Sequence, residues 1–385
     1  MDSIVVVGAS LAGVSTVGAL RQQGHNGQVI LIGDEADRPY ARPPLSKAVL
    51  QGTQEPGDAT LPALDYDVEL ILGDGAVELN VAEHRVGLHS GRSTAFDHLV
   101  IATGSRPRTI RPDARGETVL RSLRDCVSLR RTLREERPSV LILGGGFLGM
   151  EVASVCRALG LPVTVVDITE PLERALGPVL SARFRQAAAE AGARLLTIEA
   201  GFHLLGEEKL TGIRLRDGTM IEADLVITAI GDVPNTEWLS GSGLEIAGDS
   251  VLIDDRCTAA PGIYAVGDVT AWRDPDGTVR RRPHYSQAID QARIAAHALL
   301  GGTGSAPRIP PPYFWTDMFQ LYLRICGEIP VGTAPEIIEG DLEAGSALLG
   351  WKVAGQPVAA AALNYKIPVP RLRNLITTHP LSVSP

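Results

Sequence analysis

The chain has 385 residues, and because a typical domain takes about 150 residues, two or three domains are expected. Its formal net charge is −9 at pH 7, which argues against a nucleic-acid-binding protein that works through a broad basic face. Apolar residues make up 44%, as in ordinary globular proteins, but the 41 glycines exceed the usual share and indicate many tight turns.

The first predicted unit lies near the N-terminus. Residues 4–7 are a β-branched run that ends at Gly8, and a stretch with helical character follows. Gly24 stands where a helix commonly ends in a left-handed residue, and a second β-rich run follows at residues 29–32. This is the order of a βαβ unit.

The same order recurs later in the chain. Residues 4–13 are echoed by residues 140–149, and Gly160 again stands at the expected end of a helix. Another apolar run that leads into glycine, residues 98–104, is echoed by residues 224–231. The repetition predicts two α/β domains of similar fold.

Three segments rich in glycine, proline or arginine are expected to be linkers: residues 105–117, 234–243 and 301–312. The last part of the chain, residues 313–385, alternates short β-rich runs such as residues 325–329. It predicts a small α+β domain after the two α/β domains.

The cysteines exclude two kinds of site. Cys126, Cys156, Cys257 and Cys326 lie far apart and form no C-x-x-C pair, so neither a structural disulfide nor a metal centre is expected. The sequence has no run of 18 apolar residues and no charged-then-apolar leader, which predicts a cytoplasmic protein without a membrane partner.

The glycine-rich loops carry the strongest chemical signal. A strand that turns sharply into a helix presents backbone N–H groups and the positive end of the helix dipole to a pyrophosphate. Gly144 would permit the tight turn, Gly146 the approach of the diphosphate, and Gly149 close helix–strand packing. In the first loop, between Gly8 and Gly13, Ser10 replaces the middle glycine, and its hydroxyl can bond a phosphate oxygen.

Each loop is followed by an acid that suits an adenosine ribose. In the second unit it is Asp167, at the end of the next β-rich run, and in the first unit it is Asp34 or Glu35. A carboxylate at Asp167 would repel a 2′-phosphate, and the next arginine, Arg174, is seven positions away, so NADH is favoured over NADPH. Two loops of this kind imply two different dinucleotides.

Further motifs identify a family. They are residues 40–47 (YARPPLSK), 102–104 (ATG), 262–268 (GIYAVGD) and 312–317 (PYFWTD). Together with the loops, the pattern resembles the two-dinucleotide flavoprotein reductases, and more narrowly the FAD-dependent NAD(P)H:ferredoxin reductases of bacterial oxygenase systems, which share their fold with apoptosis-inducing factor. The resemblance implies a glutathione-reductase-like architecture. From this resemblance we expect an FAD domain at residues 1–110 and 238–308, a NAD domain at 111–237, and a C-terminal domain at 309–385.

The resemblance also implies the residues that bind FAD and NAD. In chain order they are Gly8, Ser10, Ala12, Gly13, Asp34, Glu35, Arg42, Lys47, Ala102, Thr103, Gly104, Gly144, Gly146, Phe147, Leu148, Gly149, Glu151, Asp167, Gly231, Gly267, Asp268, Tyr285 and Trp315. Asp268 would bond the ribityl chain of FAD. Relatives often carry Trp where this chain has Tyr285, which leaves the route by which electrons leave the flavin open.

Lys47 and Glu151 are implied as the catalytic pair. In this family they form an ion pair beside the flavin, with Glu151 near the nicotinamide. The ordinary alternatives are a solvated surface lysine and an acid that complements the N-terminus of its helix.

The implied function is electron transfer from NADH through FAD, one electron at a time, to a [2Fe–2S] ferredoxin that feeds a cytochrome monooxygenase or a Rieske oxygenase. Disulfide reductases of this architecture need a redox cysteine in the first domain, and no cysteine precedes Cys126. The alternatives are a flavin oxidase or quinone reductase, and a redox-sensing protein like apoptosis-inducing factor. Residues 280–282 (RRR), with Arg371 and Arg373, are a candidate docking rim for an acidic ferredoxin, or simply a solvated basic loop.

Overall fold

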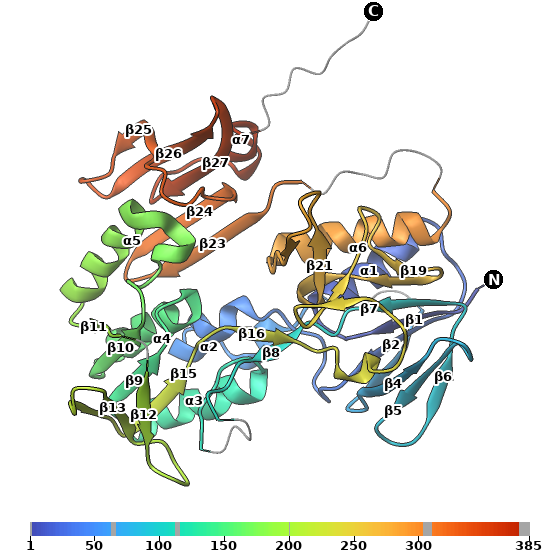
Figure 1. The fold of residues 1–385 in the computed structure, drawn as a ribbon, viewed down its shortest axis with the longest axis horizontal. Coiled ribbons are helices and arrows are strands. Elements are labelled where there is room, and N and C mark those ends of the chain that lie inside the picture. Colours follow the sequence, from blue (N-terminus) through green and yellow to red (C-terminus); the bar gives the residue numbers. More distant parts are fainter. Residues whose placement is uncertain (1, 63–66, 112–115, 200, 303–309, 377–385) are drawn as a thin grey trace, which may run out of the picture. The chain divides into compact units, whose positions relative to one another are not determined.

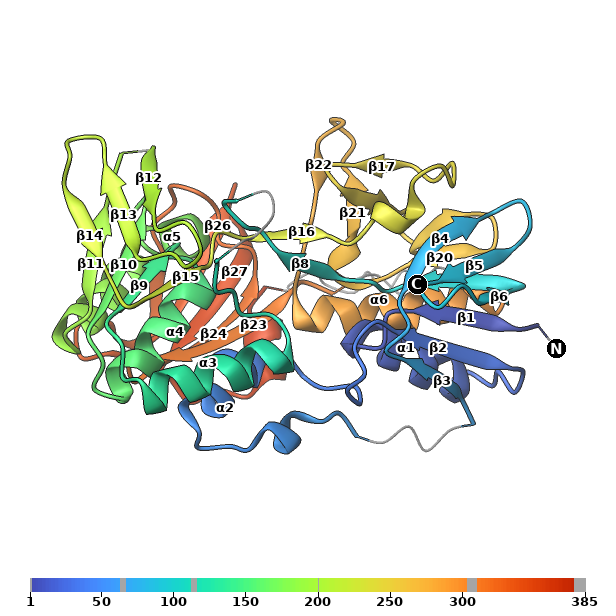
Figure 2. The ribbon, with the colours of Figure 1, turned by 90° about the horizontal axis from the view of Figure 1, so that it is seen from below.

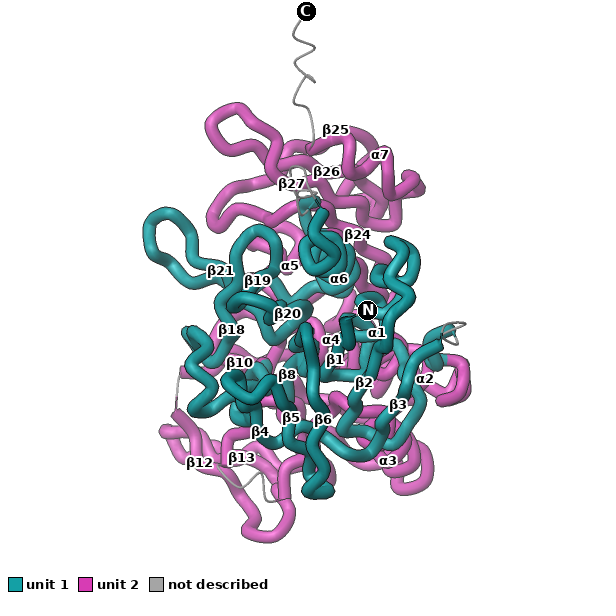
Figure 3. Tube along the Cα trace, turned by 90° about the vertical axis from the view of Figure 1, so that its right-hand side faces the viewer, with its two compact units in different colours: residues 1–41, 59–106, 232–312 teal, residues 42–58, 107–231, 313–385 magenta. Residues whose placement is uncertain are grey.

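The structure, a computed structural model, describes residues 2–62, 67–111, 116–199, 201–302 and 310–376. The chain divides into two compact units, each assembled from segments that are distant in sequence (Figure 3). Unit 1 comprises Met1–Ala41, Ala59–Arg106 and Asp232–Pro312, and unit 2 comprises Arg42–Asp58, Pro107–Gly231 and Tyr313–Pro385.

Unit 1 is built around one mostly parallel sheet. Its elements are β1 (Ile4–Val7), α1 (Leu11–Gln22), β2 (Val29–Gly33), β3 (Glu69–Leu72), β4 (Ala76–Asn80), β5 (Arg85–Leu88), β6 (Ser93–Ala95), β7 (His98–Ile101), β16 (Asp232–Pro234), β17 (Ile246–Ala247), β18 (Ser250–Leu252), β19 (Thr258–Ala260), β20 (Ile263–Ala265), β21 (Thr270–Arg273), β22 (Val279–Arg280) and α6 (Tyr285–Leu299). The strand β8 (Ser105–Pro107) begins in this unit and pairs with β16.

The central sheet of unit 1 has the order β19-β20-β7-β1-β2-β3. Strands β20, β7, β1, β2 and β3 run parallel, and β19 pairs antiparallel with β20. Every residue of β1 is buried, which its apolar sequence IVVV favours in a parallel sheet. Helices α1 and α6 pack against each other beside it (Figure 1).

Unit 2 contains a second parallel sheet and the C-terminal sheet. Its elements are α2 (Ala48–Gln51), α3 (Leu123–Glu135), β9 (Val140–Leu143), α4 (Phe147–Ala158), β10 (Val163–Asp167), α5 (Glu173–Glu190), β11 (Arg194–Thr197), β12 (Phe202–Leu205), β13 (Gly212–Leu215), β14 (Met220–Glu222), β15 (Leu225–Thr228), β23 (Tyr313–Met318), β24 (Leu321–Gly327), β25 (Glu336–Asp341), β26 (Ser346–Val353), β27 (Gln356–Leu363) and α7 (Val369–Asn374).

The second parallel sheet has the order β11-β10-β9-β15 (Figure 2). Helix α4 packs on β9 and β10, and α5 is kinked where Pro178 follows the non-helical Gly177. The C-terminal sheet is antiparallel, in the order β23-β24-β27-β26-β25, and its strand β23 contacts α4. The small side chains of the alanines at 359–362 allow β27 to be buried in the middle of this sheet.

Both parallel sheets contain a point at which the strand order changes direction. In unit 1, β1 lies between β2 and β7, and in unit 2, β9 lies between β10 and β15. The loops at the carboxyl ends of such strands border the crevice in which doubly wound sheets bind ligands. Both predicted glycine loops follow these two strands.

The predicted fold class is confirmed: the chain has two Rossmann-like sheets and a C-terminal α+β region. The two predicted helix stops are confirmed as well, since Gly24 and Gly160 have φ values of +94° and +72°. Residues 112–115 and 303–309 of the expected linkers, and residues 377–385 of the tail, lie outside the described residues. The division into three domains stays a prediction.

Among the residues that the structure describes, no helix has both the length and the apolar character needed to cross a membrane.

Candidate functional site

The two glycine loops have the same backbone hydrogen bonds. Gly8 N–H donates to Ile32 at 2.7 Å, and Gly144 N–H donates to Val166 at 2.8 Å. On the other side, the N–H of Ala102 donates to Val7, and that of Ala229 donates to Leu143, both at 2.7 Å. The repeat seen in the sequence is therefore a repeat of loop geometry.

Close packing explains the outer glycines of each loop. A Cβ atom on Gly8 would lie 2.1 Å from the Ala102 oxygen, and one on Gly144 would lie 2.2 Å from the Ala229 oxygen. Gly13 and Gly149 leave even less room, because a Cβ would lie 1.9 Å and 2.0 Å from the carbonyl oxygen of the first glycine in the loop. A side chain at Gly13 or Gly149 would push the helix away from the strand, and one at Gly8 or Gly144 would collide with the backbone that follows the neighbouring strand.

The middle position of each loop is different. A Cβ on Gly146 would meet nothing within 4 Å, so the space above the N-terminus of α4 is open. Ser10, at the N-terminus of α1, makes no side-chain capping bond to its own helix. The N-terminus of α4 thus has room for a diphosphate, and at the N-terminus of α1 the Ser10 hydroxyl is not used to cap its helix, so these residues fit the diphosphate of a dinucleotide.

The carboxylate of Asp167 is hydrogen-bonded to the second glycine loop. Its Oδ2 accepts the Gly145 N–H at 2.6 Å, and its Oδ1 accepts the N–H groups of Ile168 and Thr169 at 2.6 and 3.2 Å. The carboxylate is therefore held in one orientation at the end of β10. It adds a fixed negative charge beside the loop.

The first unit places its acid differently. Gly33 occupies in β2 the position that Asp167 occupies in β10, and a Cβ at Gly33 would lie 2.7 Å from the Cβ of Ala9. Of the two acids that follow, Asp34 is exposed, whereas Glu35 is partly buried and accepts the hydroxyl of the buried Tyr40 at 2.5 Å. Glu35 is thus the acid whose carboxylate is oriented.

Lys47 and Glu151 meet within unit 2. Lys47 Nζ lies 2.7 Å from Glu151 Oε1, and the side chain of Glu151 is only 7% exposed. Two hydroxyls complete the cluster: Thr316 donates to Oε1 at 2.6 Å and Ser46 to Oε2 at 2.5 Å. Two hydroxyls and one ammonium group thus share a single buried carboxylate.

Ser46 and Thr316 are absent from the predicted site residues. Both lie within motifs that the sequence displays, and Ser46 directly precedes Lys47. Thr316 is fully buried in β23, and a buried polar residue in a strand requires a partner. That requirement was a usable signal, but the identity of the partner depends on a contact 165 positions along the chain.

Aromatic residues also gather in unit 2. Phe147, at the start of α4, packs on Phe314 with ring centroids 4.2 Å apart. Trp315 stacks on Tyr313 at 5.8 Å. Tyr285 belongs to unit 1, where it begins α6, and burial raises the pKa of its hydroxyl.

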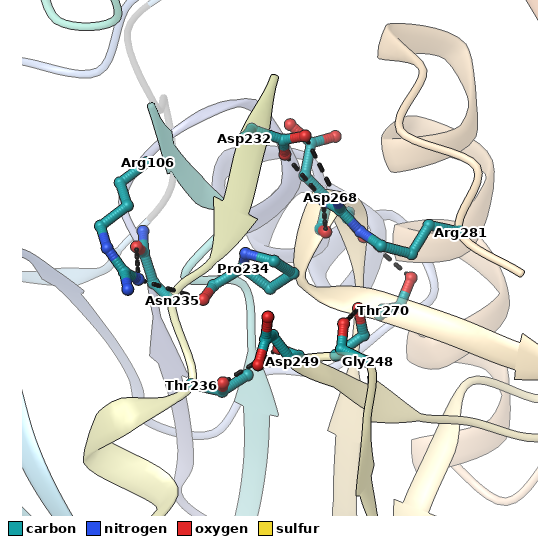
Figure 4. Close-up of polar contacts among 12 residues, drawn as sticks. Arg106, Asp232, Pro234, Asn235, Thr236, Gly248, Asp249, Asp268, Thr270 and Arg281 are labelled. Carbon is teal, nitrogen blue, oxygen red and sulfur yellow. Dashed lines mark hydrogen bonds and ion pairs between the residues drawn. The ribbon is translucent and has the colours of Figure 1, made fainter. Parts of the chain in front are cut away.

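The remaining FAD residues predicted in unit 1 pack closely or make hydrogen bonds within that unit. Gly267 packs on α1, since a Cβ there would lie 2.9 Å from the Cβ of Ala12. The Thr103 hydroxyl donates to the Asn235 carbonyl at 2.8 Å, and Asn235 N–H donates to Gly104 at 3.0 Å (Figure 4 shows the Asn235 region). Asp268 follows Gly267 directly.

Two further predicted residues make backbone contacts in unit 2. Arg42 donates to the Arg121 carbonyl at 2.7 Å, and Gly231 accepts the Arg108 N–H at 2.9 Å. Leu148 follows Phe147 in the first turn of α4. The guanidinium of Arg42 is therefore used in part to anchor its own segment.

The thiols are all free and buried. Burial raises the pKa of Cys126 and of Cys326 to about 11 and that of Cys156 to about 12, and it also raises the pKa of Cys257. A thiol attacks a disulfide only as its thiolate, which these values disfavour at neutral pH.

The arginines of the candidate docking rim have partners within the protein. Arg280 pairs with Asp274, and the Arg282 guanidinium lies over the Trp272 ring at 5.7 Å. Arg281 pairs with Asp232 at 2.7 Å (Figure 4). The Arg373 guanidinium lies 6.0 Å from the centroid of the Tyr313 ring, and Arg371 lies 3.6 Å from Glu339.

Comparison with known proteins places the chain among reductases. Residues 2–298 match the family described as pyridine nucleotide-disulphide oxidoreductase. The ferredoxin reductase component of chlorobenzene dioxygenase from Cupriavidus sp. (strain PS12) is 36% identical over 354 residues, which cover 90% of this chain and 85% of that protein. A rubredoxin-NAD(+) reductase from Ectopseudomonas oleovorans is 33% identical, covering 85% of this chain and 87% of that protein.

A solved structure agrees with these relatives. The covalent putidaredoxin reductase-putidaredoxin complex has a TM-score of 0.86 at 29% sequence identity, and the match covers 97% of this chain and 92% of that chain.

Proposed function

Because this chain belongs to the pyridine nucleotide-disulphide oxidoreductase family, we propose that it is an FAD-dependent NADH:ferredoxin reductase of an oxygenase system. One observation favours a ferredoxin reductase over the disulfide reductases of this family. The chain keeps two dinucleotide cradles, but its four cysteines are free and buried with raised thiol pKa values. Electrons therefore leave without a thiol relay.

The residues fit both dinucleotides. The cradle of Gly8 and Ser10 would hold the FAD diphosphate, with Glu35 at the ribose and Asp268 at the ribityl chain. The loop at Gly146, with Asp167, would hold NADH. We assign residues 1–110 and 238–308 to FAD binding, 111–237 to NAD binding, and 309–385 to the C-terminal domain.

FAD supplies the chemistry of this reaction when bound, because it accepts an electron pair from a nicotinamide and releases electrons singly to a [2Fe–2S] partner. The role of the chain is to orient the bound groups and to hold charged side chains in fixed positions. Glu151 holds the Lys47 ammonium by an ion pair, and Thr316 in turn holds the Glu151 carboxylate by a hydrogen bond. The two charges are therefore arranged before any ligand binds. Such preorganised charge costs no reorganisation during the reaction.

The choice between NADH and NADPH rests on Asp167. The carboxylate is fixed by the N–H groups of Ile168 and Thr169 and by that of Gly145 in the glycine loop, so it cannot easily turn away from a 2′-phosphate. NADH is therefore the preferred donor.

A cytoplasmic location fits this chemistry. NADH is a cytoplasmic reductant, and four free cysteines suit a reducing compartment.

The test is NADH-driven reduction of cytochrome c by the purified flavoprotein, with a [2Fe–2S] ferredoxin, with a rubredoxin, or with neither added. Turnover that depends on the ferredoxin and exceeds that with rubredoxin is the expected result. Peroxide formation at full rate with no added carrier would instead identify a flavin oxidase. A stable complex of reduced flavin and NAD with little turnover would identify a redox sensor.

A further inference from the structure

The turn at Gly267 and Asp268 is held by side chains from three different places in unit 1. Gly267 N–H donates to Gln291 Oε1 at 2.6 Å, from helix α6. The Thr270 hydroxyl donates to the Gly267 carbonyl at 2.8 Å, from β21. Arg281 Nη2 donates to the Asp268 carbonyl at 2.9 Å. Three backbone polar groups of this turn thus each have a side-chain partner (Figure 4 shows Thr270, Arg281 and Asp268).

These partners are themselves fixed. Gln291 is 1% exposed and Thr270 is 2% exposed, and Gln291 Nε2 donates to the Thr270 hydroxyl at 3.0 Å. A buried amide that donates to one partner and accepts from another has a defined orientation. The turn therefore rests on a rigid polar network rather than on its own backbone alone.

Arg281 is fixed by a carboxylate. Its Nη1 and Nη2 atoms lie 3.2 Å and 2.7 Å from the two oxygens of Asp232, which is a two-point contact (Figure 4). Only the guanidinium fork can bond both carboxylate oxygens and a carbonyl group with one planar group. Asp232 is the first residue of β16, where the chain re-enters unit 1.

We propose that Arg281 is a positioning residue for FAD binding: oriented by Asp232, it holds the Asp268 backbone so that the Asp268 carboxylate is set for the ribityl hydroxyls. The inference rests on the proposed function, which assigns that carboxylate to FAD. Gly267 has a φ of +80°, a conformation that glycine adopts readily, and the Asp268 side chain follows it directly. Affinity gained by fixing a binding group before the ligand arrives is preorganisation.

The prediction concerns FAD affinity in the full-length protein. Arg281→Met should raise the dissociation constant of FAD about tenfold, because the turn loses one of its three restraints and the carboxylate loses its orientation. The constant is measured from flavin fluorescence, which increases on release. Arg281→Lys, which keeps the charge and one donor, should recover part of the affinity. Arg280→Met is the matched control, since Arg280 pairs with Asp274 instead, and it should bind FAD like the parent.

A double-mutant cycle separates positioning from general support of the fold. If Arg281 acts through Asp268, then Arg281→Met should cost no further FAD affinity in an Asp268→Ala protein. Equal losses in the presence and absence of the Asp268 carboxylate would overturn the proposal. Should Arg281→Met not fold, Asp232→Asn tests the same contact with little change in volume and should also weaken FAD binding.

The same cycle distinguishes failure of the positioning role of Arg281 from failure of the assignment of Asp268 to FAD. Weakened binding by Asp268→Ala together with unchanged binding by Arg281→Met refutes only the positioning role. Unchanged FAD affinity in Asp268→Ala refutes the assignment of that carboxylate to FAD, on which the proposed function draws.

Discussion

The side chain of Glu151 is held by three residues that are distant from it in sequence. Its carboxylate accepts from Ser46 and Thr316 and pairs with Lys47, and it is nearly excluded from solvent. Removal of any one of these partners should destabilise the folded protein, because it leaves a buried charge without its full set of partners.

Lys47→Met should therefore lower both stability and activity. The free energy of unfolding should fall by about 2 kcal/mol, less than for a fully buried pair because two hydroxyls remain and Lys47 is 19% exposed. NADH-dependent flavin reduction should slow by at least about tenfold, since a fixed positive charge is lost. Urea unfolding and stopped-flow absorbance measure the two effects.

The matched control is Lys352→Met. Lys352 also lies 2.7 Å from a carboxylate, that of Glu336, but both side chains are more than half exposed. Its loss should change the free energy of unfolding by less than about 1 kcal/mol. A Lys47→Met protein that retains the parental rate of flavin reduction would contradict the role given to Lys47.

At the scale of an element, the junction between β9 and α4 assigns different tasks to two glycines. Gly149 lies where a Cβ would stand 2.0 Å from the Gly144 oxygen, so its role is packing within the protein. Gly146 faces open space and has a φ of −73°, which alanine adopts without strain. Its role is to leave room for a ligand.

Alanine substitutions should separate these two roles. Gly149→Ala should lower the free energy of unfolding by about 3 kcal/mol, because the helix must move off the strand. Gly146→Ala should cost about 1 kcal/mol or less, as an ordinary change at a helix N-cap, yet raise the KM for NADH about tenfold. Thermal unfolding and steady-state kinetics provide the comparison. A parental KM in Gly146→Ala would show that no diphosphate approaches this residue.

At the scale of the whole molecule, the chain combines the fold of the pyridine nucleotide-disulphide oxidoreductases with cysteines that are all buried. Its cysteines are distributed over both units, and all four are buried. Since burial raises their pKa values, they stay protonated near neutral pH and form thiolates only in strongly alkaline solution.

A thiol titration should therefore find almost no reaction in the native protein. At pH 8, Ellman's reagent should modify fewer than one cysteine per chain within minutes, and all four once guanidinium unfolds the protein. The native reaction should stay slow at mildly alkaline pH as well, because burial raises the pKa of Cys126 and of Cys326 to about 11. One fast-reacting thiol whose replacement by alanine abolished turnover would point to disulfide chemistry.

The sequence by itself determined the features that depend on near neighbours along the chain. The two strand–glycine–helix loops, the helix ends at Gly24 and Gly160, and the acid at the end of β10 follow from local spacing. Backbone conformation in a tight turn depends on the few residues that form it, so such features can be predicted from the sequence.

Only the tertiary structure decided which distant side chains meet. It selected Glu35 over Asp34 as the oriented acid, brought Thr316 to Glu151, and engaged Arg281 with Asp232 and the Asp268 backbone. The pairs that involve Glu151 and Arg281 join residues 13 to 165 positions apart. No local rule specifies such a pair, because it forms only when packing of whole strands and helices brings the two side chains within reach.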